Sequence, residues 1–338
     1  MTHFEFWPPR LFEAPYYLYL LGQCALRGLA PKTLAKANYA LDHGELGLGS
    51  KYATQMAFEQ DYFLPTVLLQ TDGATSEIHA QAAAFAAQAG YPLILKPDIG
   101  AVGKGIIKVD DEKDLARALE ALRGRYLCQQ YTPHAEEFGV FYARKQGHGQ
   151  ITGINQKHFP TVIGDGRTDL AGLAAAHPRF TDHWGLFLRY LDTTRVPAAG
   201  EVVRLSFVGS HTMGCKFTND TALATPALAA ALDKICVSQP GFNFGRFDLK
   251  APSTAALQEG DFVVIEVNGI ASLPTHMFDP AHSVWQAYRI FLDHGKLLAQ
   301  IADEHRDRSM PLDGYGEIWA RAKENHKALD ALHADLIA

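Results

Sequence analysis

The chain has 338 residues, of which 47% are apolar and 20% are charged, as is usual for a globular protein with a substantial core. A net charge of -6 provides no basic surface for nucleic acid, so we expect no nucleic-acid partner. The length allows two domains or one large domain with subdomains. The four cysteines form no CxxC pair, which is typical of reduced thiols and predicts a cytoplasmic location.

The first fifty residues are rich in aromatic side chains. Their start, MTHFEFWPPR, lacks the charged and apolar regions of a secretory signal, and the apolar run Tyr16–Leu26 is too short to span a bilayer. We interpret residues 16–29 as a helix that packs on the core. Two other interpretations of the aromatic residues stay open, namely peripheral contact with a membrane and, together with Trp184, binding of a bulky substrate.

Two lysines in the next part of the chain follow features that suit phosphate binding. A glycine-rich loop, HGELGLGS, is followed by Lys51 and a predicted helix over residues 52–62. Further along, the buried strand YPLILKP ends in Lys96. Lys51 is interpreted either as a solvated residue or as a contact to a phosphate.

The loop after Lys96, DIGAVGKG, connects two predicted strands. It does not match a Walker loop, because its lysine is followed by glycine and a β-branched run rather than by Ser or Thr and a helix. Backbone amides without side chains can approach a polyphosphate closely. We predict that Gly100, Gly103, Lys104 and Gly105 form a flap over a nucleotide. An ordinary glycine turn is the alternative.

Two predicted strands toward the C-terminus, FGRFDLK and FVVIEVN, carry acids among apolar residues. An irregular insert with a glycine turn separates them, so that they can pair antiparallel and bring Asp248 opposite Glu266. Positions two apart share one face of a strand, so Glu266 and Asn268 point together. Two carboxylates and an amide oxygen suit Mg²⁺, or Mn²⁺ in its place. Acids solvated at a sheet edge are the alternative.

The order of these motifs resembles the ATP-grasp superfamily, specifically carboxylate-amine ligases such as D-alanine:D-alanine ligase, from about Lys51 to Leu298. The resemblance implies an α+β fold in which two α+β subdomains enclose ATP after a shortened, mainly helical N-terminal region. The implied parts are an N-terminal region 1–50, a central subdomain 51–135, a C-terminal subdomain 136–300 and a helical tail 301–338.

The resemblance also implies which residues bind ATP. A hinge segment would hold the adenine, an acidic residue would bind the ribose, and lysines would bind the phosphates. The implied residues are Gln129, Gln130 and Tyr131 for adenine, Glu137 or alternatively Glu136 for ribose, and Lys51, Lys96 and Lys216 for phosphates. Lys157, beside an insert that looks like that of cyanophycin synthetase, is the rival of Lys216.

At the reaction centre, the resemblance implies that Arg246 stabilises an oxyanion and that Asp248, Glu266 and Asn268 bind Mg²⁺. Thr275 and His276 would contact the substrate, with His276 either a general base or a structural residue. The implied reaction activates a carboxylate as an acyl phosphate and joins it to an amine, releasing ADP and phosphate. An ATP-grasp kinase and a non-catalytic nucleotide-binding protein are the alternatives. We expect small-molecule carboxylate and amine substrates, and the helical ends could pair two subunits as a homodimer.

Overall fold

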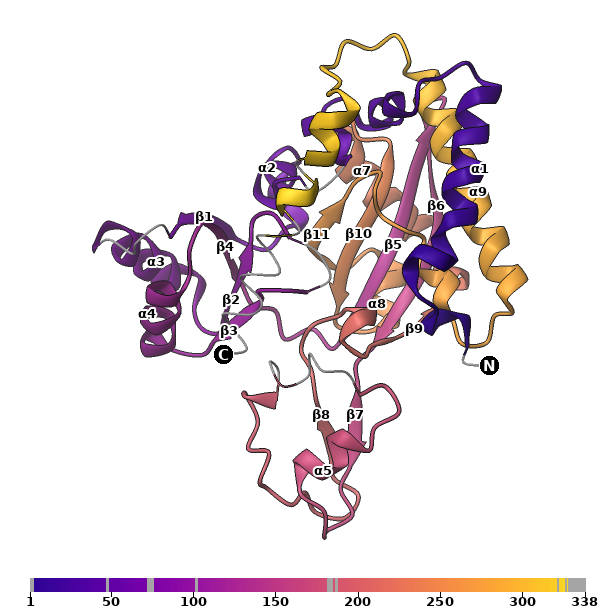
Figure 1. Ribbon diagram of the computed structural model, residues 1–338. Coiled ribbons are helices and arrows are strands. Elements are labelled where there is room, and N and C mark those ends of the chain that lie inside the picture. The colour runs from indigo at the N-terminus through magenta and orange to yellow at the C-terminus, as the bar shows by residue number, and fades with distance from the viewer. Residues whose placement is uncertain are drawn as a thin grey trace.

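Two antiparallel sheets and a small projecting lobe form the protein, as seen in the computed structural model (Figure 1). Helices and sheets are both prominent, which confirms the predicted α+β class. The structure describes residues 3–46, 49–71, 76–100, 103–180, 185, 188–320, 322–325 and 327.

The first sheet has four strands in the order β1-β4-β2-β3, and every neighbouring pair is antiparallel. The strands are β1 (Thr66–Gln70), β2 (Leu93–Pro97), β3 (Ile107–Val109) and β4 (Arg125–Gln130). Helices α3 (Ser76–Ala89) and α4 (Glu112–Ala121) cover one face of this sheet, where Leu93 and Leu95 are buried. Because side chains alternate along a strand, Ile94 and Lys96 lie on the opposite face.

The second sheet has five strands in the order β11-β10-β5-β6-β9, again antiparallel throughout. The strands are β5 (Glu136–Lys145), β6 (His148–His158), β9 (Lys216–Asn219), β10 (Phe244–Ala251) and β11 (Val263–Asn268). Strand β6 is the longest but was not predicted, because its polar and glycine-rich sequence has low strand propensity. Its pairing with β5 is favoured by the two-residue turn Gln146-Gly147, in which both residues have positive φ.

One expectation about the two strands that carry the predicted metal ligands needs correction. The insert between β10 and β11 is not irregular, because it forms helix α8 (Thr254–Glu259). Ser253 caps the start of this helix by accepting a hydrogen bond from the Ala256 amide, and Gly260 ends it with a φ of 84°. The helix brings the chain back so that the two strands pair as predicted.

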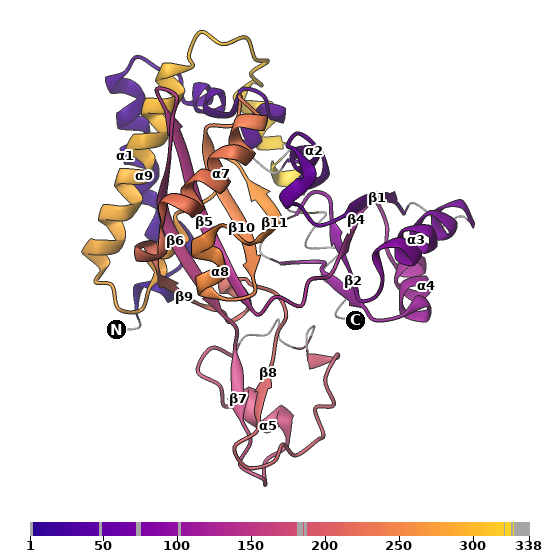
Figure 2. The ribbon, with the colours of Figure 1, turned by 180° about the vertical axis from the view of Figure 1, so that it is seen from behind.

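Different helices cover the two faces of the second sheet (Figures 1 and 2). Helices α7 (Pro226–Ser238) and α8 pack on the face that carries Phe247 and Leu249. On the other face, α1 (Pro9–Leu26) and α9 (Val284–Glu304) cover Ala143 and Phe244. These two helices leave the neighbouring part of that face, with Arg246, Asp248 and Lys250, to line a cavity.

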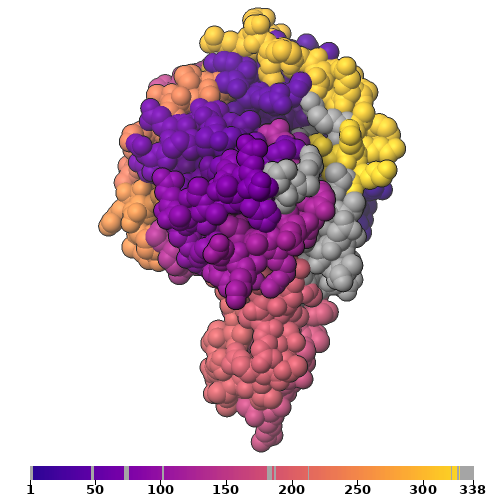
Figure 3. Space-filling view, turned by 90° about the vertical axis from the view of Figure 1, so that its left-hand side faces the viewer, coloured from indigo at the N-terminus to yellow at the C-terminus, as the bar shows by residue number. Residues whose placement is uncertain are grey.

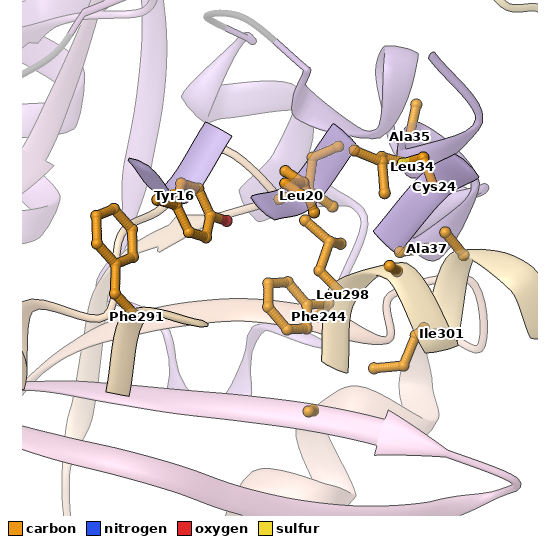
Figure 4. Packing of buried hydrophobic residues seen from close by; sticks show 14 of the residues in the cluster. Tyr16, Leu20, Cys24, Leu34, Ala35, Ala37, Phe244, Phe291, Leu298 and Ile301 are labelled. Carbon is orange, nitrogen blue, oxygen red and sulfur yellow. The ribbon is translucent and has the colours of Figure 1, made fainter. Parts of the chain in front are cut away.

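The N-terminal region shares this core with α9. The rings of Tyr16 and Phe291 stack with centroids 3.9 Å apart and planes 8° apart (Figure 4). Ser283 and Gln286 form a reciprocal capping box at the start of α9. The predicted domain boundaries at 50 and 300 stay predictions. Residues of the segment 3–46 nevertheless pack on the same sheet as helix α9. Residues 328–338 of the predicted tail lie outside the described residues.

A small lobe projects from the body of the molecule (Figure 3). It contains β7 (Thr161–Ile163), α5 (Leu170–Ala175) and β8 (Val202–Arg204), and it has its own small core. This lobe occupies the position of the insert predicted from the sequence. Trp184, which the sequence suggested as a contact for a bulky substrate, lies outside the described residues.

Shorter elements connect these parts. They are η1 (Phe4–Phe6), η2 (Pro31–Asn38), η3 (Asp42–Glu45), α2 (Lys51–Met56), η4 (Gln60–Tyr62), η5 (His211–Met213), η6 (Thr221–Leu223) and η7 (Thr275–Phe278). Within the described residues, none of the helices has the length and apolar character needed to cross a membrane.

Candidate functional site

A cavity of about 990 Å³ lies between the two sheets and extends to the N-terminal segment. This volume is at the upper end of the range for small-molecule sites. The four-stranded sheet contributes Ile94, Lys96 and Gln129, which lie on its helix-free face. The five-stranded sheet contributes a row of charged side chains from β10, β11, β5 and β6.

The pairing of β10 with β11 places the predicted metal ligands side by side. Asp248 is the direct partner of Glu266, and Arg246 is the partner of Asn268, which confirms the predicted register. The Nδ2 atom of Asn268 is 3.3 Å from Oδ2 of Asp248. Two carboxylates and an amide therefore meet at one wall of the cavity.

Arg246 lies across β5 because a glycine leaves room for it. A Cβ atom on Gly139 would come within 3.1 Å of the Cδ of Arg246 and within 2.4 Å of the Oδ1 of Asn155. From this position the guanidinium donates two hydrogen bonds to Asp248, of 2.9 and 3.1 Å. The Arg246 side chain is 17% exposed, so it can also reach a ligand in the cavity.

A buried chain of ion pairs continues from Asp248 across the sheet. Lys157 lies 3.1 Å from Asp248 and 3.0 Å from Glu137, and Lys250 lies 3.8 Å from the other oxygen of Glu137. Burial alone would raise the pKa of Asp248, but the charges of Arg246 and Lys157 outweigh it and lower the pKa. For Lys157, burial acts to lower the pKa, while Asp248 and Glu137 raise it overall.

Lys250 and Glu45 also line the cavity, although neither was predicted as a site residue. The signal for Lys250 was present in the sequence, since it follows Asp248 by two positions and so shares its strand face. Glu45 belongs to the glycine-rich loop before Lys51, and it accepts hydrogen bonds from the Gly269 amide and the Thr54 hydroxyl. Burial raises the pKa of Glu45.

Lys51 and Lys96 both reach the cavity near Glu266. The Nζ atom of Lys51 is 3.4 Å from Oε1 of Glu266 and donates to the carbonyl of Gly100. Lys96 donates to the Ile265 carbonyl at 2.7 Å, which links the two sheets. Burial lowers the pKa of Lys96 to about 8, despite the opposing effect of Glu266.

The three predicted hinge residues all line the cavity, but their side chains differ in direction. Gln129 accepts a hydrogen bond from Lys96 at 3.1 Å, whereas the Gln130 side chain donates to the Ala89 carbonyl at 2.8 Å. The Tyr131 ring lies 5.8 Å from the ammonium of Lys250. The backbone amides of Gln130 and Tyr131 also donate within the protein, so the Tyr131 ring is the hinge feature that a ligand can reach.

Four predicted site residues lie outside the cavity lining. Lys216 is exposed on edge strand β9, so Lys157 is the lysine that the fold brings to Asp248. His276 is buried against Phe141, with ring centroids 5.4 Å apart. Burial lowers the pKa of His276 to about 4, and the residue lies outside the cavity lining. Lys104 and Gly105 are the other two residues outside the lining.

Thr275 and the glycine flap do reach the cavity. Thr275 lines it and donates a hydrogen bond of 2.7 Å to Oδ1 of Asn155. Gly100 and Gly103 also line it, whereas residues 101 and 102 of the flap lie outside the described residues. Gly103 has a φ of 80°, and a Cβ there would lie 2.6 Å from the Val208 side chain, so the close approach requires glycine.

The donors in this cavity suit a hard divalent cation that is shared with a polyphosphate. Across the described ranges, no three His, Cys, Asp or Glu side chains converge as a metal site. A cation here would instead take oxygens from Asp248, Glu266 and Asn268, and the rest from a ligand, which is the usual manner of Mg²⁺ binding. Lys51, Lys96 and Lys157 offer positive charge to the phosphates of the same ligand.

No protein-family model matches the sequence, and no curated protein matches it. Among solved structures, the chain is similar to a bifunctional glutathione synthetase from Pasteurella multocida, with 18% identity, a TM-score of 0.38 and coverage of 72% of this chain and 36% of the other. It is also similar to D-alanyl-alanine synthetase A from Vibrio cholerae, with 15% identity, a TM-score of 0.40 and coverage of 76% and 65%.

A D-alanine-D-alanine ligase from Helicobacter pylori matches with 17% identity, a TM-score of 0.39 and coverage of 74% of this chain and 60% of the other. This chain thus spans only about one to two thirds of the length of these solved chains. Identities and TM-scores this low carry no argument about activity. The activity must be inferred from the side chains of the cavity itself.

Proposed function

We propose that this protein is an ATP- and Mg²⁺-dependent ligase that activates a carboxylate as an acyl phosphate and joins it to an amine. The observation that carries the proposal is the meeting of Asp248, Glu266 and Asn268 with Arg246 and Lys157 in one cavity between two sheets. Reaction of two anions, a carboxylate and a triphosphate, requires such a concentration of positive charge and cation ligands.

The residues of the chain would divide the work of binding ATP. Lys51, Lys96 and Lys157 would neutralise the phosphates, and Gly100 and Gly103 would let backbone amides approach them. The hinge at Gln129 to Tyr131 would hold the adenine. Glu137, which pairs with Lys157 and Lys250, would lie within reach of the ribose. Mg²⁺ held by the three oxygen-bearing side chains would supply further positive charge to the phosphates.

The proposed reaction has two steps. A carboxylate oxygen of the first substrate forms a bond to the γ-phosphorus of ATP, and the bond to ADP breaks. The nitrogen of the amine then attacks the carbonyl carbon, phosphate leaves with the electron pair of the broken C–O bond, and the nitrogen loses a proton. Arg246, at the cavity wall beside Asp248, would stabilise the acyl phosphate formed in the first step and then the tetrahedral oxyanion formed when the amine attacks.

The first test is binding of a non-hydrolysable ATP analogue with Mg²⁺, measured by calorimetry on the full chain. Lys157→Met should weaken this binding at least tenfold, because it removes a phosphate contact. Lys216→Met is the matched control and should leave it unchanged, since that lysine lies outside the cavity lining. Lys51→Met provides a second variant if Lys157→Met melts at a much lower temperature. Absence of binding by the unmodified chain would contradict the proposal.

The second test is release of ADP over a panel of carboxylic acids and amines, with the products analysed by mass spectrometry. Amide formation with one ADP and one phosphate per product is the expected result. A stable phosphorylated product without an amide would identify a kinase instead. Binding of the ATP analogue without turnover of any member of the panel would favour a nucleotide-binding protein that does not catalyse.

A further inference from the structure

The cavity has a second end, which is formed by aromatic side chains rather than ions. This aromatic end lies between the N-terminal segment and η7, and it also includes Phe180 of the lobe. Two of its rings are unusually exposed for large apolar side chains, since Phe6 is 51% and Phe180 is 44% exposed. The residues of the aromatic end are Phe4, Phe6, Trp7, Phe180, Leu273 and Phe278.

The aromatic end is continuous with the ion-rich end, which is the part of the cavity lined by Arg246, Asp248, Lys250, Glu266 and Asn268. Almost every residue of the segment from Asn268 to Leu273 lines the cavity, and Thr275 and Phe278 extend the lining further. One wall therefore leads directly from a predicted metal ligand to the aromatic rings. A molecule whose reacting group lies beside Arg246 can extend along this wall.

Glu5 and Arg179 at the aromatic end compensate each other's charge. Glu5 is buried and accepts hydrogen bonds of 2.9 and 2.7 Å from Nη2 of Arg179, while His211 lies 3.1 Å from the same carboxylate. The Phe6 ring covers the Arg179 guanidinium with a separation of 5.2 Å. This ion pair ties the N-terminal segment to the lobe. Glu13 of α1 also lines the cavity, where it accepts a hydrogen bond of 3.2 Å from the Tyr17 hydroxyl.

On the basis of the proposed ligase function, we propose that one of the two substrates carries a broad apolar group, aromatic or alkyl, that binds at the aromatic end. Its carboxylate or amine then lies at the ion-rich end, near Arg246. Apolar groups bind such surfaces because they leave water, which strengthens binding by about fourfold for each buried methylene. A substrate as small as alanine would leave the aromatic end unfilled.

An apolar fluorescent probe tests the site without knowledge of the substrate. We expect anilinonaphthalene sulfonate to bind the full chain with a rise in fluorescence and to remain bound when Mg²⁺ and the ATP analogue are added. Trp7→Ala and Phe6→Ala should each weaken its binding at least fivefold. Trp285→Ala, a matched control on α9 that is 79% exposed and outside the cavity, should not. Displacement of the probe by the analogue, or equal affinities in all variants, would overturn the proposal.

Two substrate series identify which partner carries the apolar group. The rate of ADP release is measured with acetate, butyrate, hexanoate and phenylacetate as acids, and with glycine, leucine and phenylalanine as amines. We expect kcat/KM to rise about fourfold per added methylene in one series only. In Trp7→Ala, KM for the longer substrates should increase, so that kcat/KM no longer rises with chain length. Binding of the ATP analogue should stay unchanged. Equal rates along both series would overturn this inference but not the ligase proposal, which fails only if the analogue does not bind or no amide forms.

Discussion

The two ends of the cavity are built in different ways. At the ion-rich end, Arg246, Asp248 and Lys250 come from alternate positions of one strand, and the next strand supplies Glu266 and Asn268. At the aromatic end, the residues are distant in the sequence, since Glu5 pairs with Arg179 and the Phe278 ring lies 5.1 Å from that of His211. Strand periodicity places these five side chains of the first end, whereas the second end requires the packing of three separate segments.

The largest effect should follow a change at the ion-rich end. Asp248→Asn should lower ADP release by about 10³-fold, because it removes a carboxylate ligand of the proposed Mg²⁺, whose charge would neutralise the phosphates. Asp261→Asn, on the exposed turn before β11, is the matched control and should retain normal activity. Rates are measured with the substrates found in the panel, and melting temperatures verify folding. Activity within tenfold of the unmodified chain would remove Asp248 from the reaction centre.

A change at the aromatic end should act on stability instead. Arg179→Ala leaves the buried Glu5 carboxylate with only histidine partners, and we expect a loss of about 2 kcal/mol in the free energy of unfolding. Arg195→Ala is the control, because its pair with Glu201 is exposed and should contribute less than about 1 kcal/mol. Urea unfolding gives both values, and equal losses would show that the ion pair does not hold the N-terminal segment.

This ion pair also predicts a dependence on pH. Burial alone would raise the pKa of Glu5, but hydrogen bonds from His211 and Arg179 outweigh it and lower the pKa. Its stabilising contribution is therefore complete above the ordinary glutamate pKa of 4.5 and is lost as the pH falls through the lowered value. The difference in unfolding free energy between the unmodified chain and Arg179→Ala should accordingly shrink in acid.

A smaller effect should distinguish the lysines of the ion-rich end. Because the pKa of Lys96 is about 8, its charge is lost as the pH rises through that value, and binding of the ATP analogue should weaken between pH 7 and 9 by up to about tenfold per unit. Lys96→Met should remove this dependence. Lys51→Met should move it to higher pH, since the charge of Lys51 lowers the pKa of Lys96. Calorimetry across this range measures both, and an unchanged profile in Lys96→Met would assign the titration to another group.

The smallest effect concerns a glycine between the two ends. A Cβ on Gly209 would lie 1.9 Å from Oε1 of Glu137 and 2.9 Å from Cδ of Lys157, so Gly209→Ala should disturb this buried pair and cost about 1 to 2 kcal/mol. Gly22→Ala, in helix α1 with nothing within 4 Å, should stabilise the protein by up to about 1 kcal/mol. Thermal unfolding of both variants compares them. Similar shifts in melting temperature for the two variants would indicate that Glu137 and Lys157 move to accommodate the added Cβ.

Several features of the site could be predicted from the sequence because they depend on local periodicity. Alternation along two apolar strands predicted that Asp248 and Glu266 face each other, and the register of β10 with β11 confirms it. Glycine spacing predicted a flap, of which Gly100 and Gly103 line the cavity. In these cases the local backbone conformation determines the direction in which each side chain points, so no knowledge of distant packing is needed.

Other features were decided only by tertiary structure. Lys157 rather than Lys216 reaches Asp248, because the pairing of β6 with β5 turns it inward, whereas Lys216 lies exposed on the edge strand. His276 looked like a substrate contact in the sequence but is buried under Gly153. The aromatic residues of the N-terminus are divided between a core with α9 and the open cavity. A sequence determines which side chains alternate together, but burial depends on which distant segment covers each face, and that is a property of the whole fold.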